Sequence, residues 1–169
     1  LKKTEVSMPE GMPHVCPGSM ARSLKKKQEP PVQAEKKEVP RNIGEQISRL
    51  AQWPVQIKLV PVNAPYFENA QLLIAADCTA YAYADFHEKF MKDHVTLIGC
   101  PKLDEGDYAD KLTEIIRNNS IRSIRIVRME VPCCGGIENA VIRAMERSGK
   151  MIPWQVVTIA CDGTIREEL

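Results

Sequence analysis

The sequence predicts an α/β domain: a small Rossmann-like three-layer sandwich around a mostly parallel, five-stranded sheet. Two observations lead to this prediction. Short apolar runs alternate with segments whose apolar residues recur every three to four positions, which is the pattern of strands joined by crossover helices. The 169 residues are 44% hydrophobic but only 5% aromatic, which suits a core of Val, Ile, Leu and Ala.

The chain is predicted to have two parts. Residues 1–40 hold six of the twelve prolines, eight basic and five acidic side chains, and no apolar period, so they are expected to form a flexible, basic, Pro-rich arm or linker. Residues 41–169 are expected to form the Rossmann-like domain. Its start is a short amphipathic helix with the apolar residues Ile43, Ile47, Leu50 and Ala51 on one face. Because the chain begins at Leu1 within a charged segment, it is expected to be the downstream piece of a longer protein.

Five segments have the apolar composition of strands and are predicted to form the sheet. They are 55–60, 72–76, 95–98, 121–131 and 156–159. The first alternates apolar and polar residues, so it is expected at an edge with one face buried. The second and third are apolar on both faces, as central parallel strands are. An Asp162-Gly163 turn follows the fifth.

Three helices are predicted between these strands, because apolar residues recur there at i, i+3, i+4 and i+7. Their apolar stripes run over 83–90, 108–116 and 137–145. His87 falls on the first stripe, one turn from Phe90, and is predicted to be a core histidine. Right-handed crossovers place helices on both faces of the sheet.

Charge and hydropathy exclude several classes of protein. With 23 Lys and Arg against 22 Asp and Glu, no nucleic acid or anionic membrane is expected as a partner. No apolar run approaches the roughly 20 residues that cross a bilayer, and the N-terminus lacks an apolar signal core, so a cytoplasmic protein is expected. The motifs of phosphate-binding loops, serine hydrolases and zinc proteases are absent from the sequence. The sequence predicts no particular oligomeric state.

Four cysteines follow three of the predicted strands. Cys78 comes after 72–76, Cys100 after 95–98, and Cys133-Cys134 after 121–131. Because parallel strands lie about 4.8 Å apart and end at one edge of the sheet, these thiols are expected to converge there. Four thiolates are the usual ligands of an iron–sulfur cluster or a structural zinc ion. The sequence therefore predicts a metal site made of Cys78, Cys100, Cys133 and Cys134, with a 4Fe–4S cluster as first choice and zinc as the alternative.

Other residues have weaker assignments. Cys16, in a turn-like Cys-Pro-Gly-Ser stretch of the arm, is a further candidate ligand, whereas Cys161 has no partner in sequence and is expected to be packed or exposed. Asp77 and Asp104 flank the site, either as a pKa-perturbed pair or as helix caps. Gly135-Gly136 opens the helix at Ile137, whose first amides would favour a thiolate or sulfide nearby.

Several segments of the chain resemble one protein family. They are 16–19, 53–56, 63–67, 75–78, 84–87, 99–104 and 129–134. Together they resemble the region downstream of the ferredoxin module in the 4Fe–4S-binding, ferredoxin-linked iron–sulfur cluster-binding oxidoreductases of anaerobes. The likeness spans nearly the whole chain, but the closely spaced Cys runs of the family's two-cluster ferredoxin are absent here. The resemblance implies association with a ferredoxin domain or another redox protein, and does not imply a particular reaction.

The sequence thus favours an iron–sulfur redox or electron-transfer domain over a stand-alone enzyme. A thiol-based redox enzyme is the alternative, in which Cys133 and Cys134 act as nucleophile and resolving group without a metal. A third reading is a structural zinc or interaction domain whose cysteines are buried and inert.

Overall fold

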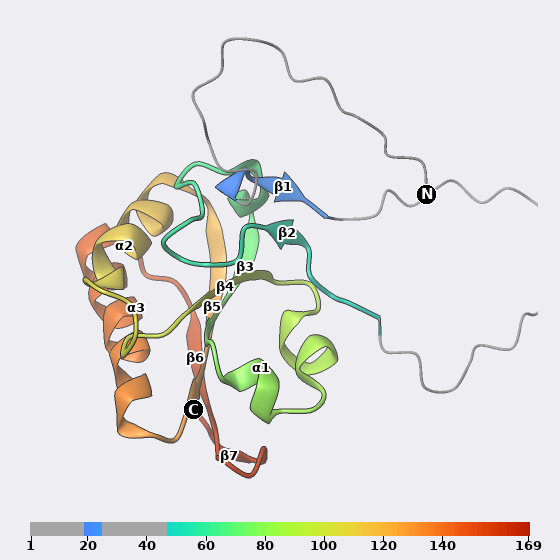
Figure 1. Ribbon diagram of the computed structural model, residues 1–169. Helices are drawn as coiled ribbons and strands as arrows, with labels where there is room; N and C mark the ends of the chain where they lie inside the picture. Colours follow the sequence, from blue (N-terminus) through green and yellow to red (C-terminus); the bar gives the residue numbers. More distant parts are fainter. Residues whose placement is uncertain (1–18, 25–46) are drawn as a thin grey trace, which may run out of the picture.

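A computed structural model describes residues 19–24 and 47–169 of the chain (Figure 1). Its main sheet has the order β4-β3-β5-β6-β7. The strands are β3 (Ala70–Ala76), β4 (Val95–Gly99), β5 (Ile121–Met129), β6 (Trp154–Ile159) and β7 (Ile165–Glu168). The first four are parallel, and β7 pairs with β6 in the antiparallel direction. The predicted α/β class and mostly parallel, five-stranded sheet are confirmed.

Helices cover both faces of the sheet (Figure 1). On one face, α2 (Tyr108–Asn118) and α3 (Gly135–Ser148) pack against each other and against Leu72 and Ile74 of β3. The other face carries α1 (Thr79–Ala82) and a π-helix (His87–Met91). Each face has its own apolar cluster, because successive side chains of a strand point to opposite sides. None of the helices in 19–24 and 47–169 is long and apolar enough to span a membrane.

The predicted edge strand at 55–60 is wrong. Only Gln56 bridges β4, at Ile98, and residues 57–59 form a turn in which the Val60 amide donates to the Gln56 carbonyl at 3.1 Å. Ile57 and Val60 are both fully buried. The alternation in this segment therefore comes from a turn that places apolar residues three positions apart in the core.

The fifth strand is β7, which was not predicted. Its sequence, Ile-Arg-Glu-Glu, is mostly exposed at the edge of the sheet and lacks the apolar signal of a buried strand. It follows the predicted Asp162-Gly163 turn, in which Gly163 has a φ of 87°. Backbone pairing with β6 therefore makes this segment a strand, although its side chains lack the pattern that predicts one.

The predicted helix at 43–51 is not observed where the structure describes it. Residues 47–51 are not helical, and 43–46 lie outside the described residues. Instead β2 (Gln52–Trp53) pairs in the antiparallel direction with β1 (Arg22–Ser23). A short piece of the range predicted as a linker therefore lies beside the domain.

The helices at 108–116 and 137–145 are confirmed as α2 and α3, but the one at 83–90 is only partly right. There α1 ends at Ala82, and the π-helix begins at His87. Phe86 and Phe90 fill the core, whereas His87 is exposed and its Nδ1 accepts a hydrogen bond from the Arg49 amide at 3.1 Å. The prediction of a core histidine is therefore wrong, because the π-helix breaks the regular stripe.

Candidate functional site

The carboxyl ends of β3 and β5 mark the switch point of the sheet. From β3 the chain crosses to α1 on one face, whereas from β5 it crosses to α3 on the other (Figure 1). Open α/β sheets bind their ligands outside the carboxyl ends of the strands, where neighbouring connections diverge in this way. The residues that follow these two strands are therefore the first candidates for a site.

Three of the predicted cysteines lie at this switch point. Cys78 occupies the N-cap position of α1, and Cys133 and Cys134 end a single 3-10 turn that leads directly into α3. Cys78 and Cys133 are exposed, whereas Cys134 is 5% exposed and belongs to the apolar cluster on the α1 face. The two loops therefore present two accessible thiols and one buried thiol.

The pKa of Cys134 is perturbed, and the other two cysteines contribute to the shift. Burial is the main cause that raises the pKa of Cys134, and a hydrogen bond with the Cys133 side chain and the charges of Cys133 and Cys78 raise it further. A hydrogen bond with the Met129 backbone acts in the opposite direction. The loops after two adjacent strands thus bring these cysteines to one part of the sheet edge, as the strand order predicts.

Cys100 follows β4 as predicted and is half-buried. Its carbonyl accepts hydrogen bonds from the Leu103 and Asp104 amides at 3.1 and 2.9 Å, which fold the loop into a turn. The next residue, Pro101, packs on the first turn of α3, since a Cβ placed on Gly136 would lie 2.9 Å from the Pro101 Cβ. The loop after β4 thus reaches the start of α3.

The side chains do not form the predicted four-thiol metal site as they lie. Within residues 19–24 and 47–169, no three His, Cys, Asp or Glu side chains are in positions to share a metal ion. Cys16 lies outside the described residues. The topology brings Cys78, Cys133 and Cys134 into one neighbourhood, but it does not arrange them as a closed set of ligands.

Cys161 shares this edge of the sheet, although the prediction excluded it from the site. It follows β6, which is parallel to β5, so it also leaves the sheet at a carboxyl end. It is exposed, which is one of the two alternatives, packed or exposed, that were predicted for it. Its amide donates to the Glu130 carboxylate at 2.9 Å, which lowers the pKa of Glu130, while desolvation and that carboxylate raise the pKa of Cys161. The sequence already places Cys161 just after the last predicted strand, which is the signal that could have included it with the other cysteines.

Asp77 and Asp104 form a pair beside the thiols. Desolvation and the charge of Asp104 raise the pKa of Asp77, while a hydrogen bond with Gln56 acts to lower it. Tyr108, which is 5% exposed, donates its hydroxyl to Asp104, and burial together with that carboxylate raises the pKa of Tyr108. Asp77 therefore has a perturbed pKa to which Asp104 contributes, and the N-cap of α1 is Cys78 rather than Asp77. The cap of α2 is Asp107, which accepts from the Ala109 amide at 2.9 Å.

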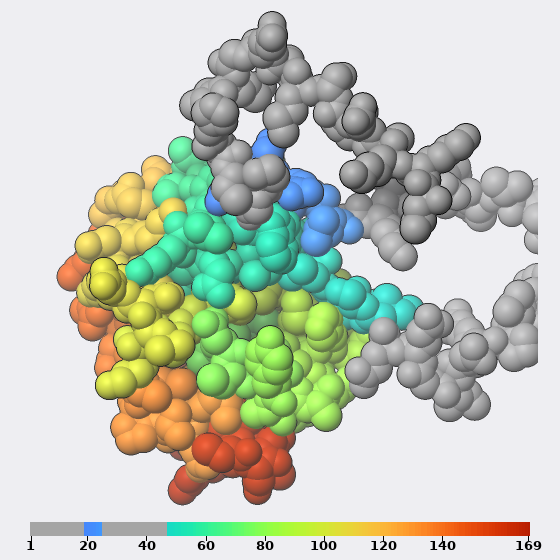
Figure 2. All heavy atoms as spheres, viewed as in Figure 1, coloured from blue at the N-terminus to red at the C-terminus, as the bar shows by residue number. Residues whose placement is uncertain are grey.

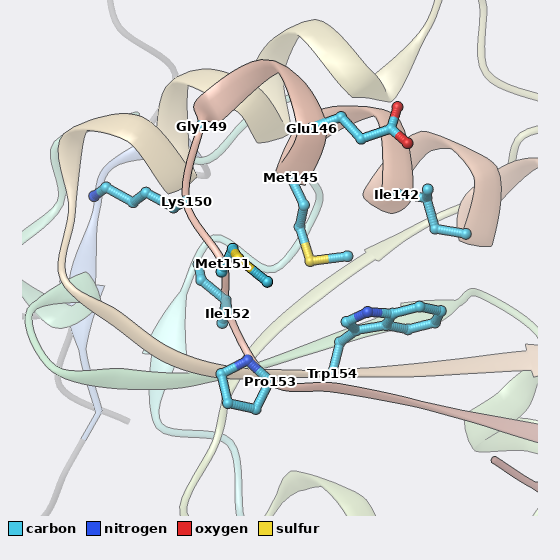
Figure 3. A pocket seen from close by; sticks show the side chains of 9 residues that line it. All are labelled: Ile142, Met145, Glu146, Gly149, Lys150, Met151, Ile152, Pro153 and Trp154. Atoms are coloured by element: carbon cyan, nitrogen blue, oxygen red, sulfur yellow. The ribbon is translucent and has the colours of Figure 1, made fainter.

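Two cavities lie at the other end of the sheet. One, of about 640 Å³, lies between the end of α3 and the start of β6, where Trp154 and Met151 are partly and fully exposed (Figure 3). The other, of about 850 Å³, lies at the start of β3 and β4. Among the described residues that line them there is no cysteine. These two cavities are therefore separate from the cysteines at the carboxyl ends of the strands.

Comparisons with known proteins bear on the fold and not on the chemistry. The sequence model of a family described as a Rossmann-like domain matches residues 64–169, which hold all five strands of the main sheet. A protein of Archaeoglobus fulgidus, described as uncharacterized, is 31% identical over 119 residues, which are 70% of this chain and 84% of the relative. No solved structure matches the chain.

Proposed function

The chain belongs to the family of Rossmann-like domains that its sequence matches, and we propose that its functional site is the switch point of the sheet. We propose further that the protein is a thiol-based redox protein. One observation supports this most. The buried Cys134 thiol adjoins the exposed Cys133, and Cys133 and Cys78 are both among the causes that raise its pKa. The loops after two adjacent strands thus present two accessible thiols and one buried thiol at the same edge of the sheet.

Cys133 is the attacking thiol in this proposal. It is exposed, and it lies two residues before the first turn of the 14-residue helix α3, whose free amides stabilise negative charge. Cys134 stays protonated in this proposal, because burial raises its pKa. The pair therefore consists of one exposed thiol that reacts and one buried thiol that does not.

Cys78 is the resolving thiol. Adjacent residues have Cα atoms about 3.8 Å apart, whereas disulfides usually join Cα atoms about 4.4–6.8 Å apart, so a bond between Cys133 and Cys134 would be strained. Cys78 comes from the neighbouring strand and is exposed like Cys133. This assignment replaces Cys134 in the resolving role that sequence reasoning gave it.

The reaction is a thiol–disulfide exchange. The Cys133 thiolate attacks one sulfur of a disulfide substrate and expels the other as a thiolate, which takes up a proton. The Cys78 thiolate then attacks the Cys133 sulfur and releases the second substrate thiol. Two electrons pass to the substrate, which becomes two thiols, and the protein keeps a Cys78–Cys133 disulfide.

A second candidate is the iron–sulfur domain that the resemblance implies, with a ferredoxin domain or another redox protein as partner. The convergence of Cys78, Cys133 and Cys134, with Cys100 on the next loop, favours it. The described side chains do not fit a cluster without rearrangement, since no three potential ligands are in positions to share a metal ion. When bound, a cluster would supply one-electron transfer. Zinc at the same thiols would be the structural variant.

Anaerobic purification of the full chain tests these proposals together. Iron, acid-labile sulfide and zinc are measured, and then the rate at which each thiol is alkylated. We expect metal-free protein in which one thiol reacts fastest, lost in Cys133→Ser and kept in the matched control Cys161→Ser. Mild oxidation followed by peptide mass spectrometry should find the Cys78–Cys133 link.

Other outcomes would replace this proposal. Stoichiometric iron and sulfide would establish the second candidate, and stoichiometric zinc its structural variant. Metal-free protein whose thiols all react slowly would leave only an interaction domain.

A further inference from the structure

Four loops at the carboxyl end of the sheet form one continuous surface, called here the carboxyl rim. It consists of residues 77–85, 100–107, 130–135 and 160–164. Pro101 packs on Gly136 at the start of α3, and Gly163 lies so close to the Ala82 carbonyl that a Cβ there would collide with it. In Figure 2 the green, yellow, orange and red segments adjoin in the lower half of the molecule.

The carboxyl rim is acidic. Its four loops hold seven acidic side chains and one basic one, Lys102, which is a net charge of −6. The loops at the opposite end of the sheet, 61–69, 92–94, 119–120 and 149–153, hold two acidic and two basic side chains. A chain that is nearly neutral as a whole thus concentrates negative charge around its thiols.

Three cations from outside the loops reduce this charge without cancelling it. Arg143 pairs with Asp107 at 2.8 Å, Arg166 pairs with Glu130, and Lys58 donates to the Glu105 carbonyl. Counting them, the carboxyl rim has seven carboxylates against four cations, a net charge of −3. A charged surface of this kind speeds the approach of oppositely charged molecules.

Two large apolar side chains project from the carboxyl rim. Tyr81 is 93% exposed and Leu103 is 81% exposed. Each is one turn from a rim cysteine, since their amides donate to the Cys78 and Cys100 carbonyls at 3.2 and 3.1 Å. Tyrosine is among the residues that most often anchor protein–protein interfaces. The two cavities described above lie at the other end of the sheet.

From these observations we propose that the carboxyl rim is a docking surface for a basic polypeptide that carries the disulfide substrate. The inference rests on the thiol chemistry proposed above and names its substrate class. Carboxylates of the rim attract the positive partner, Tyr81 and Leu103 contact it, and the exposed thiols of Cys78 and Cys133 meet its disulfide.

Two synthetic peptides test the proposal on the full chain. They have equal length and one leucine each, and each carries a cysteine in a mixed disulfide with the chromophore thionitrobenzoate. One has lysines around the cysteine and the other has glutamates. Release of the chromophore gives a second-order rate constant at low and at high sodium chloride. We expect the lysine peptide to react about tenfold faster at low salt, and the ratio to fall toward one at high salt.

A pair of double variants separates the carboxyl rim from the overall field of the protein. Asp85→Asn with Glu105→Gln removes two exposed rim carboxylates, and Glu68→Gln with Glu146→Gln removes two exposed carboxylates elsewhere. The first should lower the lysine-to-glutamate ratio about threefold, and the second should leave it unchanged.

Three outcomes would overturn the inference. Equal rates for the two peptides, or an equal effect of the two double variants, would overturn it and leave the thiol chemistry standing. No release from either peptide, with full release after denaturation, would overturn both proposals.

Discussion

The two faces of the sheet are built differently. On one face, α2 and α3 are regular helices of 11 and 14 residues that share the larger apolar cluster with the sheet. On the other, a four-residue α1 and a five-residue π-helix cover a smaller cluster that includes Cys134. The long helices bury most of the apolar surface and stabilise the fold. The short elements leave the strand ends accessible, and the thiols lie there.

This difference gives a general expectation. Substitutions in the α2–α3 face should change the free energy of unfolding and leave thiol reactivity as it is. Substitutions at the thiols should change thiol reactivity and leave the free energy of unfolding as it is. If both expectations hold, stability and thiol reactivity are separable between the two faces.

The largest effect is expected from Cys78→Ser. Without a resolving thiol, the mixed disulfide between Cys133 and a small disulfide substrate should persist on the order of a hundredfold longer, because no second attack releases it. Quenched samples analysed by intact mass spectrometry report its lifetime. Cys134→Ser is the matched control and should leave the lifetime short. The reverse pattern would assign the resolving role to Cys134 and contradict the assignment made from backbone spacing.

Leu112→Ala tests the opposite face. Leu112 is fully buried on α2, so truncation leaves a cavity and should lower the free energy of unfolding by about 3 kcal/mol. Urea denaturation followed by circular dichroism measures it. Leu103→Ala, at a side chain that is 81% exposed, should change stability by less than about 0.5 kcal/mol. If Leu112→Ala also slowed the alkylation of Cys133 in folded protein, the two faces would not be separable.

The contrast between the faces also explains what the sequence predicted well. Residues 108–116 and 137–145 repeat their apolar positions regularly because one side of each helix packs on the sheet, so the helices were found with nearly correct bounds. Strands 72–76 and 95–98 are buried on both faces and were found from their composition. The irregular face gave a weaker signal, since a π-helix breaks the period that the prediction relies on.

The candidate site was predictable in position and not in detail. Strand ends fix which loops meet, and this placed Cys78 beside Cys133 and Cys134. Whether sulfurs can share a ligand depends on how each loop turns after its strand, and a single 3-10 turn buries Cys134 while it leaves Cys133 exposed. Cys161 also leaves the sheet at a carboxyl end, but the prediction excludes it because it adjoins the turn after the last strand and has no partner in sequence.

Gly163→Ala tests how firmly the irregular face is held at the carboxyl rim. The residue has a φ of 87°, and a Cβ would collide with the Ala82 carbonyl at the end of α1, so we expect a loss of about 2 kcal/mol in the free energy of unfolding. Gly135→Ala is the matched control, because it begins α3 and nothing lies within 4 Å of an added Cβ. It should be neutral or slightly stabilising. Equal losses in the two variants would show that neither contact is specific.

The smallest effect concerns Asp107, which joins the carboxyl rim to the regular face. Its carboxylate caps α2 at the Ala109 amide and pairs with Arg143 on α3, and the first of these contacts is the main cause that lowers its pKa. Asp107→Ala should cost about 1 kcal/mol at neutral pH, a value typical of N-caps, since the ion pair itself is exposed and contributes little. A pKa lowered by folding means that the stabilisation is present above the ordinary aspartate pKa, about 3.9, and is lost as the pH falls through the lower value in the folded protein. The difference in the free energy of unfolding between wild type and Asp107→Ala should therefore shrink below about pH 4 in urea denaturations at a series of pH values.

Asp107→Asn keeps a capping side chain without the charge, so it should cost a few tenths of a kcal/mol at neutral pH and leave little dependence on acid. A constant difference between wild type and Asp107→Ala down to pH 2 would show that the charge of Asp107 contributes nothing to holding α2 and α3 together.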